Sequence, residues 1–350
     1  MPVDKTIGHP WSQEDCDRAL NALEQTDRLH VLVLGDLMVD AYLMGKVDRI
    51  SPEAPVPILS ASQRDRRPGG AANVALNLQA LGVAVSIAGA VGGDADGHDL
   101  VAAMEAQDMD TSAVVSFSDR RTTVKTRIMS GGQHLLRVDE EDDTDLGAEA
   151  SQLMLERIAA RMGQQAFDAI LIEDYDKGVL SPMVIEGVLH LAAQHGIPVT
   201  VDPKFRHFDA YRGVDLFKPN LKELRDGLGL LWEDGDGQGR QQAIEEGLGR
   251  LMSEWHPKAV LLTMSEHGVR IKTAIEDVHH AAHPREILDV SGAGDTVIAV
   301  ATVLLAQGVD ASTLAQVANL AGGWVCEKPG VVPIDRQALM AEIRRLPITA

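Results

Sequence analysis

An acidic residue follows a glycine-rich turn near the end of the chain, in the run Asp289-Val-Ser-Gly-Ala-Gly-Asp295. The Ala- and Val-rich segment after it is long enough for a helix over about 294–307. Glycines let a backbone approach a ligand closely, and the first N–H groups of a helix attract phosphate. Asp295 would repel that phosphate unless it has another task, such as accepting a proton from an attacking hydroxyl. The alternative is that Asp295 only caps the helix, which is the commonest use of Asp there.

More polar residues follow segments that have the pattern of buried parallel strands. His30-Val-Leu-Val-Leu-Gly35 is a continuous apolar run that leads into Asp36, and a second glycine-rich turn opens a helix at Gly69-Gly70-Ala-Ala-Asn73. Each such residue alone could be a cap or turn residue. The carboxyl ends of parallel strands converge, however, so together they favour one cleft. Its candidate residues are Asp36, Gly69, Gly70, Asn73, Asp174, Lys177, Asp202, Lys204, Asn220, Glu223, Thr263 and Asp295.

Alternating strands and helices would hold these residues in place. After the first strand, the patterns predict strands near 83–90, 168–172, 198–201, 214–217 and 259–264, and a hairpin over about 269–282. Helices are predicted near 12–23, 94–107, 147–162, 182–194, 220–228, 240–254, 311–326 and 335–345. The alternation indicates an α/β fold, and the absence of G-x-G-x-x-G after the first strand disfavours a dinucleotide-binding one.

Two segments interrupt this alternation. Residues 37–62 contain three prolines in Ser51-Pro-Glu-Ala-Pro-Val-Pro57, which excludes a helix there. Residues 120–138 are rich in Thr, Val and Ile around Ser130-Gly-Gly132, which predicts a β-hairpin. We interpret the two segments as one inserted β-layer.

Composition restricts the partners and the setting. The formal net charge of −20 disfavours nucleic acid and anionic membranes as partners. Cys16 and Cys326 are too few for a disulfide framework, no apolar run approaches the ~20 residues that span a bilayer, and the N-terminus lacks the apolar core of a secretion signal. We therefore expect a cytoplasmic protein.

The motifs resemble a known family. The runs that contain Gly69–Asn73 and Asp289–Asp295 look like the two signatures of the ribokinase-like (PfkB-type) carbohydrate kinases, and Asn220-Leu-Lys-Glu223 is similar to that family's N-x-x-E motif. The motifs stand in family order, and the similarity covers about residues 30–340. Arg49–Pro57, Asp174-Tyr-Asp-Lys-Gly178 and Asp202-Pro-Lys204 are further similar to the branch that phosphorylates D-glycero-β-D-manno-heptose 7-phosphate for ADP-heptose and lipopolysaccharide synthesis.

The resemblance implies a fold and a domain organisation. We expect one ribokinase-like domain over residues 1–350, with three α/β/α layers, a mainly parallel central sheet and a β-sheet lid formed by about 37–62 and 120–138. The lid commonly pairs with its copy, so a homodimer is expected. Relatives are often fused to an adenylyltransferase, for which a chain ending at Ala350 leaves no room, so we expect a stand-alone kinase.

The resemblance also implies residue roles. Asp295 would take the proton of the sugar hydroxyl that attacks ATP, while the N–H groups of Gly292, Ala293 and Gly294 hold the phosphate charge. Asn220 and Glu223 would hold Mg²⁺ largely through water. The residues expected to bind the sugar phosphate are Asp36, Arg49, Arg67, Gly69, Gly70, Asn73, Arg137, Asp174 and Lys177. Those expected to bind the nucleotide are Lys204, Asn220, Thr263, Ser265, Gly268 and Asn319.

Three departures from the family pattern affect the ligand contacts. Ser265 and Asp176 stand where glycine is common, and Asn319-Leu-Ala-Gly-Gly replaces small alanines beside the adenine. Whether a monovalent cation lies by Asp289, as in some relatives, stays open.

The prediction of a phosphorylated substrate depends on the basic residues in or beside the β-layer. A phosphorylated sugar explains why Arg49, Arg67, Lys125, Arg127 and Arg137 gather in or beside it in so acidic a protein, although a solvated surface is the alternative. A kinase for fructose, ribose or adenosine, or a non-catalytic sugar- or nucleotide-binding regulator, are the other interpretations.

Overall fold

The computed structural model describes residues 11–232 and 237–348, whose core is a nine-stranded sheet. The strand order is β13-β12-β11-β10-β9-β8-β1-β4-β5. All neighbours are parallel except β12 and β13, which form the antiparallel hairpin predicted over about 269–282 and lie at one edge of the sheet. The strands are β1 (His30–Gly35), β4 (Ala84–Gly92), β5 (Asp110–Phe117), β8 (Ala169–Glu173), β9 (Val199–Asp202), β10 (Leu216–Phe217), β11 (Ala259–Thr263), β12 (Val269–Thr273) and β13 (Asp277–His280).

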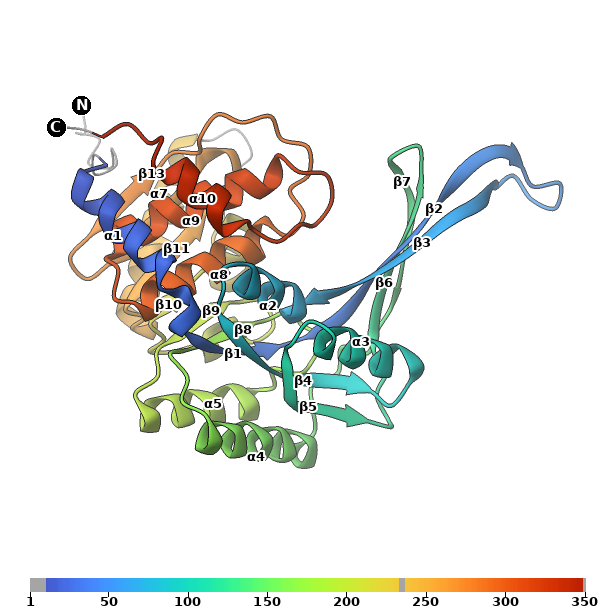
Figure 1. The fold of residues 1–350 in the computed structure, drawn as a ribbon, viewed down its shortest axis with the longest axis horizontal. Helices are drawn as coiled ribbons and strands as arrows, with labels where there is room; N and C mark the ends of the chain where they lie inside the picture. The colour runs from blue at the N-terminus through green and yellow to red at the C-terminus, as the bar shows by residue number, and fades with distance from the viewer. Residues whose placement is uncertain (1–10, 233–236, 349–350) are drawn as a thin grey trace.

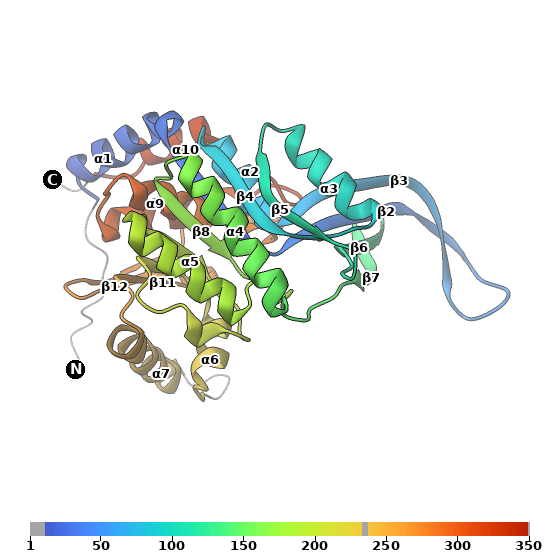
Figure 2. The ribbon, with the colours of Figure 1, turned by 90° about the horizontal axis from the view of Figure 1, so that it is seen from below.

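Helices cover both faces of this sheet (Figures 1 and 2). One face carries α1 (Gln13–Glu24), α2 (Ala71–Ala80), α3 (Ala95–Glu105), α8 (Ala293–Ala306), α9 (Ala311–Cys326) and α10 (Arg336–Ile343). The other carries α4 (Ala148–Gln164), α5 (Pro182–His195), α6 (Leu221–Leu228) and α7 (Gly237–Arg250). Successive side chains of β1 pack against opposite helix layers. Val31 and Val33 pack on the α8 side, and Leu32 and Leu34 pack on the α5 side. The predicted α/β/α architecture is confirmed.

A second, four-stranded sheet, which we call the lid, projects from this body (Figure 1). Its order is β3-β2-β6-β7, with strands β2 (Leu37–Ile50), β3 (Pro57–Gly70), β6 (Thr123–Ser130) and β7 (Gln133–Glu140). The predicted β-layer lies in this sheet, but its strands run further. β3 continues through Gly69 and Gly70, which the sequence placed in a turn, because they pair with Met38 and Leu37 of β2.

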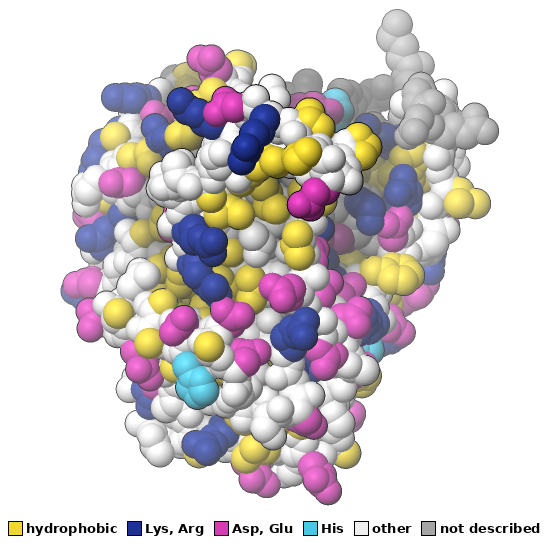
Figure 3. All heavy atoms as spheres, turned by 90° about the vertical axis from the view of Figure 1, so that its right-hand side faces the viewer, with side chains coloured by type: hydrophobic (Ala, Val, Ile, Leu, Met, Phe, Trp, Pro, Cys, Tyr) yellow, Lys and Arg dark blue, Asp and Glu magenta, His cyan; other side chains and the backbone are white. Residues whose placement is uncertain are grey.

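The lid exposes apolar side chains. Seen from the lid end, Figure 3 shows hydrophobic side chains gathered among Lys and Arg side chains. The large exposed hydrophobic residues of the lid strands and the β2–β3 tip are Ile50, Val56, Leu135, Leu136 and Val138. Such a surface on a sheet with open edges is typical of a surface that another element or molecule covers.

Two expectations about segments and membranes can be compared with the structure. The expectation about a secretion signal falls partly on residues 1–10, which lie outside the described residues. Within the described ranges, no helix combines the length and apolarity needed to cross a bilayer. The helix predicted near 12–23 is α1, which begins with a capping box between Ser12 and Asp15.

Candidate active site

Asp295 lies in the first turn of α8, with only 7% of its surface exposed. Its Oδ2 accepts a hydrogen bond from the Asn73 side-chain amide, and its Oδ1 accepts one from the Tyr175 hydroxyl at 2.9 Å. Gly292 precedes the helix with a φ of +80°, a conformation that suits glycine. The two glycine-rich turns therefore lie next to each other. One opens α2, which carries Asn73, and the other opens α8, which carries Asp295, and these two side chains are hydrogen-bonded.

The surroundings of Asp295 favour its protonated form. Burial, together with the nearby carboxylate of Asp202, raises its pKa to about 6, although the hydrogen bonds from Asn73 and Tyr175 act in the opposite direction. A carboxyl group with a pKa near the working pH is suited to accepting a proton and releasing it again. The N-cap position of α8 is Gly292, and the Asp295 carboxylate bonds Asn73 and Tyr175 from other elements, whereas a cap residue would bond the backbone of its own helix.

Tyr175 is held in place by a loop that Asp36 anchors. The buried carboxylate of Asp36 accepts the backbone N–H groups of Tyr175, Lys177 and Val179 at 2.8–3.1 Å. Asp174, also buried, accepts the Tyr211 hydroxyl at 2.7 Å, and burial beside Asp36 raises its pKa to about 7. The structure thus shows Asp36 and Asp174 as organisers of the 174–179 loop, and their predicted contact with a sugar stays a prediction.

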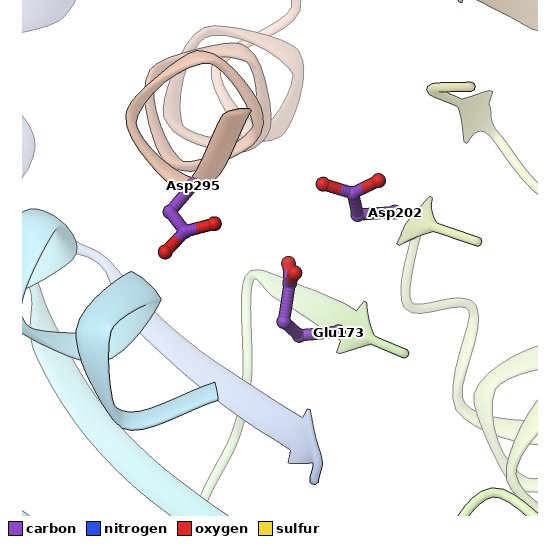
Figure 4. Close-up of side chains that lie close together, drawn as sticks. All are labelled: Glu173, Asp202 and Asp295. Atoms are coloured by element: carbon purple, nitrogen blue, oxygen red, sulfur yellow. The ribbon is translucent and has the colours of Figure 1, made fainter. Parts of the chain in front are cut away.

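Two further carboxylates, at the ends of two strands, lie close to Asp295 (Figure 4). Glu173 ends β8 and Asp202 ends β9, and one carboxylate oxygen of each lies within 4.8 Å of the other and of an oxygen of Asp295. Lys218, fully buried, donates to Asp202 at 2.8 Å. A Cβ added at Gly294 would stand 3.7 Å from the Lys218 Nζ, which places the start of α8 against this cluster.

The predicted nucleotide and metal residues lie beside the cluster. Asn220 and Glu223 form a capping box at the start of α6, in which the Asn220 side chain accepts the Glu223 N–H and the Glu223 carboxylate accepts the Asn220 N–H, each at 2.8 Å. The other Glu223 oxygen accepts Lys204 at 2.5 Å. Thr263 bridges to Asn220 across neighbouring strand ends. These four predicted residues are therefore brought together.

The remaining nucleotide residues shape backbone turns. Ser265 and Gly268 flank a short turn after β11, with φ angles of +53° and +85°. Asn319 on α9 donates to the Ala281 carbonyl at 2.9 Å. Ser265 and Asp176, the two residues that replace a common glycine, both adopt positive φ. Two of the three departures from the family pattern thus fall where glycine would be least strained.

A cavity of about 370 Å³ lies between α2, the lid and the 331–333 segment. Asp40, Tyr42, Arg67 and Asn73 are among its lining residues, so it reaches from the lid to the partner of Asp295. A larger, open hollow of about 660 Å³ lies at the opposite, amino-terminal edge of the strands, beside His30 and Ala84. None of the predicted site residues lines that hollow, so the smaller cavity is the one relevant to the chemistry.

The predicted cationic residues separate into two groups. Arg67 lines the cavity, and Arg127 reaches it through an ion pair with Asp40; both guanidinium groups lie over the Tyr42 ring, 5.6 and 5.3 Å from its centre. Arg49 and Arg137 are exposed, near the far end of β2 and on the edge strand β7.

Two lysines of the predicted set are paired with carboxylates. Lys125 and Lys177 both bind Glu141, at 3.2 and 3.1 Å. The structure therefore leaves Arg67 as the cation of the predicted set that lines the cavity directly.

Three site residues escaped the sequence analysis: Asp40, Glu173 and Tyr175. Strand alternation could have indicated Glu173, because it shares a face of β8 with Ala169 and Leu171, which pack on the α8 side. Asp174, which the sequence favoured, is one residue on and is held by Tyr211 instead. Asp40 gave no such signal, because its place in the cavity depends on how the lid joins the body.

The sequence model of one protein family, described as pfkB family carbohydrate kinase, matches residues 28–337. Among curated proteins, a D-beta-D-heptose 7-phosphate kinase of Bordetella bronchiseptica is 39% identical over 321 residues, which cover 91% of this chain and 97% of that protein. The bifunctional protein HldE of Citrifermentans bemidjiense is 38% identical over 321 residues. That match covers 91% of this chain but 64% of the bifunctional relative.

Solved structures share the fold. Phosphofructokinase-2 from Escherichia coli, in complex with potassium, superposes with a TM-score of 0.72 at 19% identity, covering 91% of this chain and 99% of that one. Ribokinase from Arabidopsis thaliana, complexed with ribose and ATP, gives a TM-score of 0.65 at 18% identity, covering 90% and 99%.

Proposed function

This chain belongs to the pfkB family of carbohydrate kinases, and on that basis we propose that it transfers the γ-phosphate of ATP to a hydroxyl of D-glycero-β-D-manno-heptose 7-phosphate. The product would be the 1,7-bisphosphate, a precursor on the way to ADP-heptose and lipopolysaccharide. The observation that carries the proposal is the buried Asp295, bonded to Asn73 at the edge of a cavity that also presents Arg67. Because the second substrate is ATP, we place the reaction in the cytoplasm.

Asp295 acts as the general base in this proposal. Its carboxylate would accept the hydroxyl proton as the sugar oxygen attacks phosphorus, and Asn73 and Tyr175 would keep the carboxylate aimed at the cavity. The backbone N–H groups of Gly292, Ala293 and Gly294 stand at the start of α8, where a helix stabilises negative charge. They would hold the phosphate charge that develops during transfer, which is mostly a matter of positioning and electrostatics.

The nucleotide would lie on the other side of Asp295. Lys204, Asn220 and Thr263 are gathered at the neighbouring strand ends, and the turn of Ser265 and Gly268 with Asn319 would border the base. Mg²⁺, when bound, would neutralise phosphate oxygens. Asn220 and Glu223 remain candidates to hold it through water, although the structure already uses their polar atoms in the capping box and in the Lys204 pair.

The phosphate of the sugar would bind at the lid side of the cavity. Arg67 is 47% exposed there, and it pairs with Asp65 on its own strand, donates to the Val331 carbonyl and lies over the Tyr42 ring. Gly69 and Gly70 let the backbone of β3 lie close to the cavity residue Asp40, because a Cβ at Gly69 would meet the Asp40 carboxylate at 2.3 Å. Asp40 and Asn73 would then take sugar hydroxyls, and Arg127 would keep Asp40 in place.

A substrate panel tests the proposal. Turnover with ATP should be highest on heptose 7-phosphate, compared with fructose, fructose 6-phosphate, ribose and adenosine. Higher turnover on an unphosphorylated sugar or a nucleoside would favour the alternative kinase, and no turnover on any would favour a regulator that only binds.

Arginine variants test where the phosphate binds. Arg67→Ala removes a charge-assisted contact of ~1.5–3 kcal/mol, so the KM for heptose 7-phosphate should rise about ten- to a hundredfold while the KM for ATP is unchanged. Arg49→Ala, at the exposed end of β2, is the matched control and should leave both constants unchanged. Equal effects of the two variants would contradict the placement of the phosphate.

We further propose that the lid pairs two copies of the chain. Leu135, Leu136 and Val138 are exposed on the edge strand β7, and an open apolar edge is a liability that pairing removes. A homodimer formed through the lid would cover the exposed apolar residues and pair the open edge of β7.

A further inference from the structure

Glu173 is a buried residue at the end of β8. Its side chain is fully buried, and neither carboxylate oxygen has a hydrogen-bond partner among the described residues. Asp202 Oδ1 is buried and without a hydrogen bond as well. Buried carboxylates are normally hydrogen-bonded or paired, because an uncompensated charge in a protein interior is costly. Both Glu173 oxygens and Asp202 Oδ1 therefore need a cation or a hydrogen-bond donor to offset the cost of their burial.

The lysines nearby do not complete the balance of charge. Lys218 donates to Asp202 Oδ2, and Lys204 binds Glu223 and lies 4.0 Å from Asp202 Oδ1. The group therefore combines four carboxylates, Glu173, Asp202, Glu223 and Asp295, with two ammonium groups. When all are ionised, two negative charges are left, which one divalent cation would neutralise.

The positions of the oxygens suit such an ion. The oxygens of Glu173, Asp202 and Asp295 all lie within 4.8 Å of one another, and the three side chains point into one space from β8, β9 and α8 (Figure 4). An octahedral Mg²⁺ with bonds of about 2.1 Å spans about 3–4 Å between ligands, so a small approach would bring two of these oxygens within reach. Hard carboxylate oxygens are the ligands that this ion prefers.

We propose that Glu173 and Asp202 bind a divalent cation directly, and that they form this site without nucleotide. Asp295 stands next to the ion and keeps its hydrogen bonds to Asn73 and Tyr175. Glu223 contributes indirectly, by holding Lys204 and capping α6. The inference deepens the proposed function, because the ion would serve the phosphates of ATP, but it concerns the protein alone.

The test uses the full chain without ATP or sugar. Wild-type protein in EDTA is compared with the same protein in Mg²⁺ or Mn²⁺, by melting temperature and by Mn²⁺ electron paramagnetic resonance. Wild type should bind Mn²⁺ and melt at a higher temperature with either ion. Glu173→Gln should melt at or above the wild-type temperature in EDTA, since it removes an uncompensated charge, and should bind Mn²⁺ at least about tenfold more weakly.

Two matched variants separate this site from the alternatives. Glu223→Gln keeps the capping box but removes the charge that pairs with Lys204, so it should lower the melting temperature in EDTA yet retain the response to Mn²⁺. Glu186→Gln changes an exposed carboxylate on α5 and should change neither measurement.

Two results would overturn the inference. In one, wild type gains no stability from either ion and gives no bound Mn²⁺ signal, which would make Glu173 a buried neutral acid. In the other, Glu223→Gln abolishes Mn²⁺ binding while Glu173→Gln preserves it. Because no substrate is present, these outcomes are independent of which sugar the protein phosphorylates.

Discussion

Asp295 receives one hydrogen bond on each carboxylate oxygen, and the two donors come from different parts of the chain. Asp295→Asn keeps the size and polarity of the side chain but cannot accept a proton at working pH. Turnover should therefore fall roughly 10²–10⁴-fold. The melting temperature should hold or rise, because a charge leaves a site beside Glu173 and Asp202. Steady-state kinetics and calorimetry measure the two effects.

The matched control makes the same change at the start of another helix. Asp335 caps α10 through the Ala338 N–H, and Asp335→Asn should preserve both the cap and turnover. A folded Asp295→Asn variant with turnover near the wild-type value would return Asp295 to the role of an ordinary helix-start residue.

At the residue scale, the sequence was sufficient where a motif carries its own geometry. Asn73 and Asp295 were both predicted because glycines and an apolar helix flank each of them. Glu173 and Tyr175 were missed because their importance depends on which way a strand end or loop faces. Asp36 was placed at the right strand end, but the three amides that it binds come from residues about 140 positions later in the chain. Local pattern contains no information on such contacts.

At the element scale, the turn between β11 and β12 is strained at one position. Ser265 is exposed and adopts a φ of +53°, which costs a residue with a Cβ about 1–2 kcal/mol. Ser265→Gly relieves that strain but gains entropy in the unfolded chain, so it should stabilise the protein by a net ~0.5–1 kcal/mol. Chemical denaturation measures the change.

Gly268→Ala in the same turn should have the opposite sign. Its φ is +85°, and an added Cβ would meet the His280 carbonyl oxygen at 2.1 Å. If Ser265→Gly were neutral or destabilising while Gly268→Ala behaved as expected, the positive φ at Ser265 would not be costly in solution.

Whole elements were predicted closely where burial repeats along the sequence. The central strands are continuous apolar runs, and α9 was predicted at its observed bounds of Ala311–Cys326. The lid strands were predicted too short at Gly70 and Glu140, because their register follows from pairing with β2 and β6 and their side chains are largely exposed. For the same reason, the sequence could not predict which basic residues of the lid line the cavity and which lie on the exposed surface.

At the scale of the whole molecule, the exposed lid predicts how copies associate. Leu136 on β7 is 58% exposed, and a charge there should oppose a lid-to-lid interface. Wild type should have the mass of a dimer in light scattering after size exclusion, and Leu136→Glu should shift it towards the monomer. Leu153→Glu, at a 37% exposed leucine of α4, is the control and should stay dimeric. A monomeric wild type, or a dimer that Leu136→Glu leaves intact, would contradict pairing through this edge.

One residue, Asp36, separates the last residue of the central strand β1 from the first residue of the lid strand β2. Because no loop separates the two strands, a displacement of the lid would be transmitted directly to Asp36. The Asp36 carboxylate also holds the backbone of Tyr175, whose hydroxyl donates to Asp295. A tilt of the lid would therefore alter the Tyr175–Asp295 hydrogen bond through the backbone.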